Sequence, residues 1–138
     1  MLEKAIKIAI EAHSGQLDKA GQPYILHPLR CMLKVETDIQ RISAVLHDVV
    51  EDTDWTIEAL QAEGFSKEVL EIVERVSRRE DESYDEFIER VKGNKDAVAV
   101  KISDLEDNMN IARLFSITEK DRKRLDKYIQ VWRKLKVL

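Results

Sequence analysis

The fold of this chain is decided by the stretch Ile42-Ser43-Ala44-Val45-Leu46-His47-Asp48-Val49-Val50-Glu51-Asp52-Thr53. Its apolar residues recur at the spacing of a helix that buries one face, namely Ile42, Val45, Leu46, Val49 and Val50. Among them stand four ionisable side chains, His47, Asp48, Glu51 and Asp52. Such groups cost free energy to bury unless a partner compensates them. The stretch therefore predicts a core helix that also carries chemistry.

On a helix, His47 and Asp48 are neighbours about 100° apart and can reach one cation. Glu51 lies one turn beyond His47, and Asp52 lies one turn beyond Asp48. The layout offers two metal ligands with two carboxylates stacked behind them. The alternative is a solvated helix end, because a His-Asp pair alone is a weak signal. The rest of the chain has to supply further ligands.

The composition favours helices throughout. Of 138 residues, 43% are hydrophobic and 36% are charged, and only four are Gly and two are Pro. Ala, Leu, Ile, Glu and Lys dominate, and these residues favour helices over strands. The length suits one core. We expect an all-α bundle of about seven or eight helices that forms a single domain over residues 1–138.

Several classes of protein are excluded by the same totals. No apolar run approaches the roughly 18 residues of a membrane span, and the N-terminus lacks the layout of a signal peptide. We therefore expect a cytoplasmic protein without a membrane partner. A net charge of −4 argues against a nucleic-acid partner. The single cysteine, Cys31, excludes an internal disulfide and a multi-cysteine zinc site, and is expected in the core.

The helices can be placed from their caps and apolar spacing. A polar loop at residues 14–24 separates the first helix from His27, which precedes Pro28 in the first turn of the second. Helix starts are predicted at small polar residues that can cap a first turn, namely Thr37 or Asp38, Thr56, Ser66 and Thr118.

The helix predicted over residues 97–114 is apolar but contains Lys101, Asp104 and Asn108. Positions 101, 104 and 108 follow the i, i+3, i+7 spacing, so the three side chains point the same way. The alternative is a salt-bridged rim at the surface.

Four potential metal ligands thus stand on three helices: His27, His47, Asp48 and Asp104. Two imidazoles and two carboxylates suit Mn²⁺, Fe²⁺ or Zn²⁺, with positions left for water. Such a site lowers the pKa of bound water, so hydrolysis is the natural chemistry. Glu51 and Asp52 could move a proton and orient the water, while Lys101 or Lys19 could offset phosphate charge.

Four segments carry a resemblance to a known family: residues 12–16, 21–28, 44–53, and 100–104 with Asn108-Met109. They span most of the chain. The order His27, His47-Asp48, Asp104 resembles the HD phosphohydrolase superfamily. The flanking sequence is closer to the hydrolase domain of RelA/SpoT-type alarmone enzymes and to the small alarmone hydrolases of the metazoan SpoT homologue type.

The resemblance implies an all-α domain that binds one Mn²⁺ through His27, His47, Asp48 and Asp104. It implies that Glu51 and Asp52 serve catalysis and that Asn108 lies at the nucleotide. The implied reaction removes the 3′-pyrophosphate from (p)ppGpp and gives GDP or GTP. The residues that we assign to substrate binding are Lys19, Tyr24, Lys101 and Asn108. Tyr24 could stack on a base or pack beneath the loop.

The chain departs from the alarmone-hydrolase pattern at two basic positions. Asp18 stands where the pattern has an Arg against the guanine base, and Leu105 replaces an Arg of the fourth motif. One alternative is therefore a phosphatase for another nucleotide, such as NADPH or a nucleoside monophosphate. The other is a module that binds a nucleotide without turnover. The oligomeric state is left open between a monomer and a homodimer.

Overall fold

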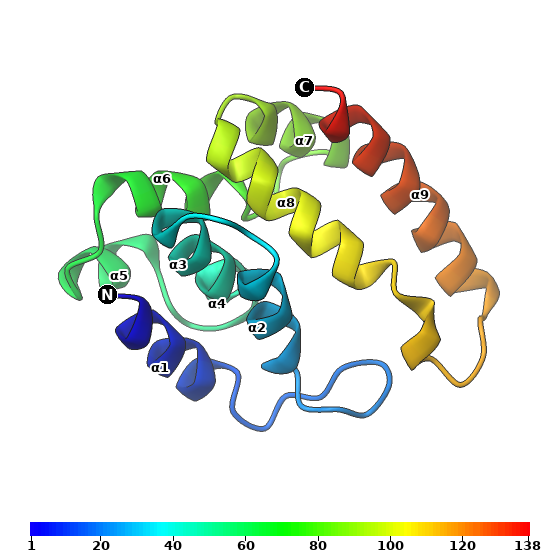
Figure 1. Ribbon diagram of the computed structural model, residues 1–138, viewed down its shortest axis with the longest axis horizontal. Helices are drawn as coiled ribbons and strands as arrows, with labels where there is room; N and C mark the ends of the chain where they lie inside the picture. Colours follow the sequence, from blue (N-terminus) through cyan, green and yellow to red (C-terminus); the bar gives the residue numbers. More distant parts are fainter.

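The computed structural model describes all residues from Met1 to Leu138, and its regular structure is helical. Nine α-helices and one 3₁₀ helix follow one another (Figure 1), and the only β-type pairing is an isolated bridge between Leu17 and Pro23. The all-α prediction is confirmed. The elements are α1 (Leu2–Ala12), α2 (Leu26–Leu33), α3 (Asp38–Leu46), α4 (Val49–Asp52), α5 (Ile57–Ala62), α6 (Lys67–Arg75), α7 (Tyr84–Lys92), α8 (Lys95–Asn108), η1 (Ile111–Arg113) and α9 (Glu119–Lys136).

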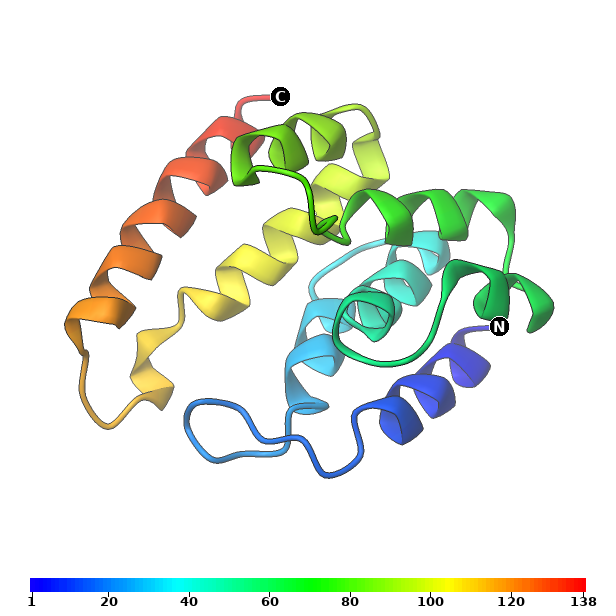
Figure 2. The ribbon, with the colours of Figure 1, turned by 180° about the vertical axis from the view of Figure 1, so that it is seen from behind.

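Helix α3 lies at the centre of the packing. It contacts α1, α2, α6 and α8, and its residues Ala44, Val45 and Leu46 are fully buried. Helix α8 crosses the middle of the molecule, with α9 packed along one side and α2 and α3 on the other (Figures 1 and 2). None of the helices combines the length and the apolar character needed to cross a bilayer.

Two apolar clusters form the core, and α3 belongs to both. Val45 and Leu46 join a cluster built from α1, α3, α5 and α6. Ala44, on another side of α3, joins a cluster built from α2, α6, α7, α8 and α9. Helix α3 is therefore shared by both halves of the core.

The predicted helix through His47 and Asp48 is split in two. Helix α3 ends at Leu46 and α4 begins at Val49, with Asp48 as its N-cap residue. The His47 N–H bonds to the Ala44 carbonyl three residues back, and the His47 ring also reaches that carbonyl. The helical ladder therefore stops at His47. The split gives nine α-helices where the sequence predicted seven or eight.

The predicted helix over residues 97–114 also differs. Helix α8 begins at Lys95, because the Asn94 side chain accepts hydrogen bonds from the N–H groups of Asp96 and Ala97. It ends at Asn108, and the Asn110 side chain caps the 3₁₀ turn η1 instead. A polar side chain that bonds to the local backbone offers an alternative to the helix ladder. The predicted caps are confirmed at Thr37, Thr56, Ser66 and Thr118.

Burial of α3 can be tested with two leucines that end neighbouring helices. Leu46 has 0% exposure, whereas Leu33 is 78% exposed. We expect Leu46→Ala to lower the free energy of unfolding by about 2–5 kcal/mol, because it removes buried methyl groups and leaves a cavity. Leu33→Ala should change it by less than about 0.5 kcal/mol. Urea unfolding measures both, and similar losses in the two variants would contradict the central position of α3.

A second prediction concerns the link between α6 and α7. Arg90 donates to both Glu82 carboxylate oxygens, at 2.5 and 2.8 Å, and to the carbonyls of Glu74 and Ser77. The hydrogen bond from Arg90 is the main cause that lowers the pKa of Glu82 from 4.5 to about 2.

Because the folded-state pKa is depressed, this pair stabilises the fold above pH 4.5 and loses its effect as the pH falls toward 2. Glu82→Gln should flatten this acid limb in unfolding experiments at graded pH. Glu89→Gln, which alters an exposed pair with Lys92, should keep it. An unchanged acid limb in Glu82→Gln would show that the pair is not responsible.

Candidate metal centre

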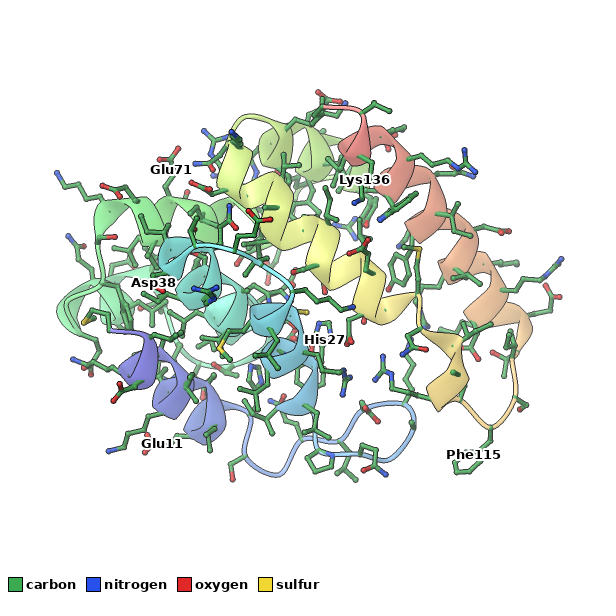
Figure 3. The ribbon with its side chains drawn as sticks, in the orientation of Figure 1. Glu11, His27, Asp38, Glu71, Phe115 and Lys136 are labelled. Atoms are coloured by element: carbon green, nitrogen blue, oxygen red, sulfur yellow. The ribbon has the colours of Figure 1, made fainter.

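The four side chains predicted as ligands meet at one buried point. His27 Nε2 lies 3.0 Å from Asp104 Oδ1 and 3.6 Å from Asp48 Oδ2. His47 Nε2 lies 3.1 Å from the same Asp48 oxygen and 3.3 Å from the same Asp104 oxygen. All four residues are at most 8% exposed. Residues distant in sequence, from α2, the α3–α4 junction and α8, thus share one centre, and Figure 3 labels His27 where α2 faces α8.

The donor set fits a divalent metal ion. Ligand bonds of about 2.1 Å at tetrahedral or octahedral angles place neighbouring donor atoms roughly 3.0–3.4 Å apart. Three of the four separations between these nitrogens and oxygens, at 3.0, 3.1 and 3.3 Å, fall within that range, and the fourth, from His27 to Asp48 at 3.6 Å, lies just above it. Nitrogen and carboxylate oxygen are donors that such ions accept.

Both imidazole rings are fixed from behind, so their Nε2 atoms face the centre. His47 Nδ1 lies 2.6 Å from the Ala44 carbonyl oxygen, which only accepts, so Nδ1 carries the proton. His27 Nδ1 lies 2.6 Å from Asp107 Oδ2, which orients that ring in the same manner. Partners of this kind fix the tautomer and orientation of histidines that bind metals.

The electrostatics of the centre favour positive charge. Burial lowers the pKa of His27, but hydrogen bonds to Asp104 and Asp107 outweigh burial and raise it to about 11. Burial also lowers the pKa of His47, and Asp48 and Asp104 outweigh it, so the pKa lies well above its usual value. Burial raises the pKa of Asp104, while Lys101 and the imidazoles bring it well below the ordinary range. The carboxylates are therefore held as anions that attract a cation.

Asp104 receives two further donors from its own helix. Lys101 Nζ lies 2.8 Å from Asp104 Oδ2, and Asn108 Nδ2 donates to Asp104 Oδ1 at 3.1 Å. The three residues share a face of α8, as their spacing predicted. Lys101 is only 9% exposed, so its ammonium group is buried against Asp104 and has little contact with water.

Tyr24 reaches the centre from the loop before α2. Its hydroxyl donates to Asp48 Oδ2 at 2.5 Å. Burial and the Asp48 carboxylate raise the Tyr24 pKa, so the hydroxyl keeps its proton. The Tyr24 ring lies 5.1 Å from the His13 ring and 5.7 Å from the His27 ring, between centroids. Tyr24 therefore holds one carboxylate of the centre.

Glu51 and Asp52 lie in α4, just beyond the His47–Asp48 junction. Glu51 Oε1 accepts the backbone N–H of Arg78 at 3.0 Å. Both residues are exposed, yet partial loss of water contact raises the pKa of each carboxyl, and the Asp48 charge adds to the rise. A carboxyl with a raised pKa is suited to proton transfer.

A cavity of about 310 Å³ opens beside His27. Its lining includes Tyr24, His27 and Asn108 from the centre and Lys19 from the loop, while Lys101 is not part of it. The lining also includes apolar and aromatic side chains from the far wall, among them Leu17, Leu114, Leu125 and Tyr128.

Sequence reasoning missed the residues behind His27. Asp107 is 1% exposed and takes Arg30 Nε at 2.7 Å on the oxygen that His27 does not use. Arg113 donates to the Asp107 carbonyl at 2.8 Å and approaches Asp18 Oδ2 at 3.6 Å. The only signal in the sequence was that Asp107 stands three residues after Asp104 in a helix, and this places the two on neighbouring faces.

Cys31 also lies nearer the centre than its apolar neighbours indicated. One donor atom each from His27, Cys31, His47 and Asp104 fall within 4.8 Å of one another. The Cys31 sulfur is 3.8 Å from His27 Nδ1 and 3.9 Å from His27 Nε2. These near-equal distances put the thiol beside the ring and away from the line of the Nε2 lone pair. Asp48 Oδ2, at 3.1 Å from His47 Nε2, is better placed as the fourth donor.

Fold and site together define a class of protein. It is an all-helical domain in which histidine and aspartate side chains from separate helices meet at one point that could hold a metal ion. A family model described as HD domain matches residues 5–135. The chain belongs to the HD-domain family.

Two relatives and one solved structure extend this result. The chain is 33% identical over 138 residues to the guanosine-3′,5′-bis(diphosphate) 3′-pyrophosphohydrolase of Aquifex aeolicus, covering 91% of this chain and 19% of that protein. It is 31% identical over 136 residues to a probable GTP pyrophosphokinase of Mycobacterium leprae, covering 89% of this chain and 17% of that protein. The chain thus spans less than a fifth of the length of these curated relatives.

The solved structure is that of a metazoan ortholog of SpoT that hydrolyses ppGpp. It matches with a TM-score of 0.80 at 22% identity and covers 97% of this chain and 84% of that one. This likeness confirms the fold.

The role of Asp107 can be tested with Mn²⁺. Asp107→Asn keeps the size of the side chain but removes the charge that orients His27. We expect Mn²⁺ to bind about 10–100-fold more weakly, as is typical when the partner of a metal-binding histidine is lost. Isothermal titration measures the affinity, and Asp126→Asn on the exposed face of α9 is the control. Equal affinities in the two variants would contradict the orienting role.

Proposed function

We propose that this chain is a metal-dependent phosphohydrolase whose ion is held by His27, His47, Asp48 and Asp104. One observation carries the proposal: two imidazole nitrogens and two carboxylate oxygens converge at 3.0–3.6 Å beside a cavity of about 310 Å³. That volume is at the small end of ligand pockets, which are roughly 300–1,000 Å³. Membership in the HD-domain family supports the same assignment.

Mn²⁺ is the proposed ion, and Fe²⁺ or Zn²⁺ would suit the same donors. A divalent ion at this point would supply positive charge that lowers the pKa of an attacking water and stabilises charge on phosphate oxygens. The protein supplies the positioning, because the ligands are fixed by Tyr24, Lys101 and Asp107.

The proposed substrate is (p)ppGpp, and the names of the Aquifex relative and of the metazoan structure support this choice. In the reaction, the oxygen of water bonds to the phosphorus attached to the ribose 3′-oxygen. The bond between that phosphorus and the 3′-oxygen breaks, the 3′-oxygen takes a proton, and pyrophosphate leaves. The other product is GDP or GTP.

The residues around the centre have proposed roles that follow from their positions. Glu51 and Asp52, one turn beyond the ligands, would accept the proton of water and deliver one to the leaving oxygen. Asn108 and Lys19 line the cavity and would contact the nucleotide. Lys101, tied to Asp104, would offset phosphate charge at the inner edge of the centre.

A second substrate class is favoured by Asp18. This carboxylate lines the cavity, holds its own loop through the N–H groups of Ala20 and Gln22, and lies near Arg113. An acid at this wall would accept hydrogen bonds from a base or sugar other than the one that an arginine would contact. NADPH or a nucleoside monophosphate is therefore the alternative substrate.

The reaction is tested by supplying purified protein with Mn²⁺ and ppGpp. We expect GDP and pyrophosphate as products, and no turnover after the metal has been removed by chelation. Asp48→Ala should lower kcat at least about 10³-fold, because the centre loses a ligand. Asp54→Ala removes an exposed carboxylate nearby and should leave kcat unchanged. Turnover that survives metal removal would rule the mechanism out.

The substrate class is tested with a panel of nucleotides under the same conditions. Release of pyrophosphate from ppGpp alone supports the alarmone assignment. Release of orthophosphate from NADPH or a nucleoside monophosphate, with ppGpp untouched, supports the alternative. Tight nucleotide binding without product under any metal would identify a binding module.

A further inference from the structure

Cys31 is a potential metal donor that the proposed site does not use. It follows His27 by four residues in α2, so both side chains lie on the same face of that helix. One donor atom each from His27, Cys31, His47 and Asp104 lies within 4.8 Å of the others, and all four residues are buried. Because Asp48 also reaches this point, the centre has five candidate donors.

The packing around Cys31 does not require a sulfur atom. The side chain has no exposed surface and belongs to the apolar cluster that includes Val35 and Ala44. A buried cysteine often acts as a small apolar side chain, and an apolar residue of similar size would fill the same space. The thiol is also a weak hydrogen-bond donor, and besides the His27 ring it reaches only the Ser103 carbonyl oxygen, at 3.8 Å. What the thiol adds here is a donor for a metal ion.

The sulfur lies close to the distance that a shared ion requires. Zinc–sulfur bonds of about 2.3 Å and zinc–nitrogen bonds of about 2.0–2.1 Å at a tetrahedral angle place the two donor atoms roughly 3.6 Å apart. Cys31 Sγ is 3.9 Å from His27 Nε2. The sulfur stands beside the ring, so it has to turn toward Nε2, and cysteine has one side-chain torsion for this movement. Because the contact with the Ser103 carbonyl is weak, little opposes the movement.

The thiol and the carboxylates prefer different ions. A thiolate is a soft ligand that suits Zn²⁺, whereas Mn²⁺ prefers oxygen donors. Zn²⁺ is usually held by four ligands at tetrahedral angles, so one of the five candidate donors would be left out. Asp104 belongs to the group of donor atoms that includes the Cys31 thiol, and Asp48 does not. Asp48 is therefore the carboxylate that the thiol can replace.

We propose that Cys31 is an alternative ligand of the centre, which replaces Asp48 when the ion is thiophilic. This inference rests on the proposed function, because it uses the same metal centre. His27, His47 and Asp104 are common to both ligand sets, and the fourth donor depends on the ion. As the bond from sulfur to the metal forms, the thiol proton passes to the solvent. Four protein ligands leave a tetrahedral ion no position for water, so the thiolate-bound form would not hydrolyse a substrate.

Co²⁺ tests the proposal because its absorption spectrum reports directly on sulfur ligands. The metal-free full chain is titrated with Co²⁺, and a thiolate ligand adds a charge-transfer band in the near ultraviolet. Cys31 is the only cysteine of the chain, so no other residue can supply this band. We expect the band in the wild-type chain and in Asp48→Asn. Cys31→Ala should lose the band but keep the visible absorption of bound Co²⁺.

Metal affinities separate a ligand from a packing residue. Cys31→Ala should raise the dissociation constant for Zn²⁺ about 100-fold, roughly the share of one ligand in four at a structural zinc site. The dissociation constant for Mn²⁺ should stay within about twofold, because the nitrogen and oxygen donors are unchanged. Val35→Ala is the matched control, since it removes apolar volume from the same cluster without removing a donor, and it should change neither constant more than about twofold.

The outcomes distinguish this inference from the proposed function. Visible absorption of bound Co²⁺ without a near-ultraviolet band in the wild-type chain would overturn the ligand role, and the Mn²⁺-dependent hydrolase would stand. Equal losses of Zn²⁺ and Mn²⁺ affinity in Cys31→Ala would make Cys31 a packing residue only. A band that disappears in Asp48→Asn would show that the thiol does not replace that carboxylate. If the band forms but the Mn²⁺-loaded chain cleaves no nucleotide, the proposed function falls and the thiol ligand remains.

Discussion

The buried carboxylate of Asp104 is the constraint on which the rest of the structure depends. One of its oxygens faces both imidazoles, at 3.0 and 3.3 Å, and the other faces Lys101 at 2.8 Å. A charge in this position costs several kcal/mol unless partners surround it, and removal of one partner leaves the others uncompensated. These contacts tie α8 to α2 and to the end of α3. The helices must therefore pack so that His27 and His47 reach the same oxygen.

A second buried carboxylate, that of Asp107, connects the centre to the cavity wall. Asp107 holds the outer nitrogen of His27 and also receives Arg30, and Arg113 links it to Asp18 at the cavity mouth. Burial raises the pKa of Asp107, but His27 and Arg30 outweigh burial and bring it well below its usual range. The Asp18 loop and the His27 ring are thus joined by one chain of contacts, so a change at the cavity wall can reach His27.

The sequence predicts what depends on local spacing. The caps at Thr37, Thr56, Ser66 and Thr118 and the apolar stripes define most helices, and the i, i+3, i+7 spacing places Lys101, Asp104 and Asn108 on one face. The break at His47 is not local in origin, because the pattern of apolar residues continues through it. It depends on a ring that turns back to the Ala44 carbonyl while its other nitrogen meets Asp104.

The role of Asp107 could not be predicted for the same reason. In sequence it resembles a solvated acid of an ordinary helix, and only the long-range approach of His27 and Arg30 buries it.

Negative charge is concentrated at the centre. The centre and its flank carry the carboxylates of Asp48, Asp104, Glu51 and Asp52, with Lys101 as the one buried ammonium among them. A diphosphate is itself strongly anionic, so it would be repelled from this point unless positive charge stood between it and the carboxylates. The imidazole nitrogens and carboxylate oxygens that meet at the centre provide a place for such a cation. An anionic substrate could therefore approach these carboxylates only with a cation bound among them.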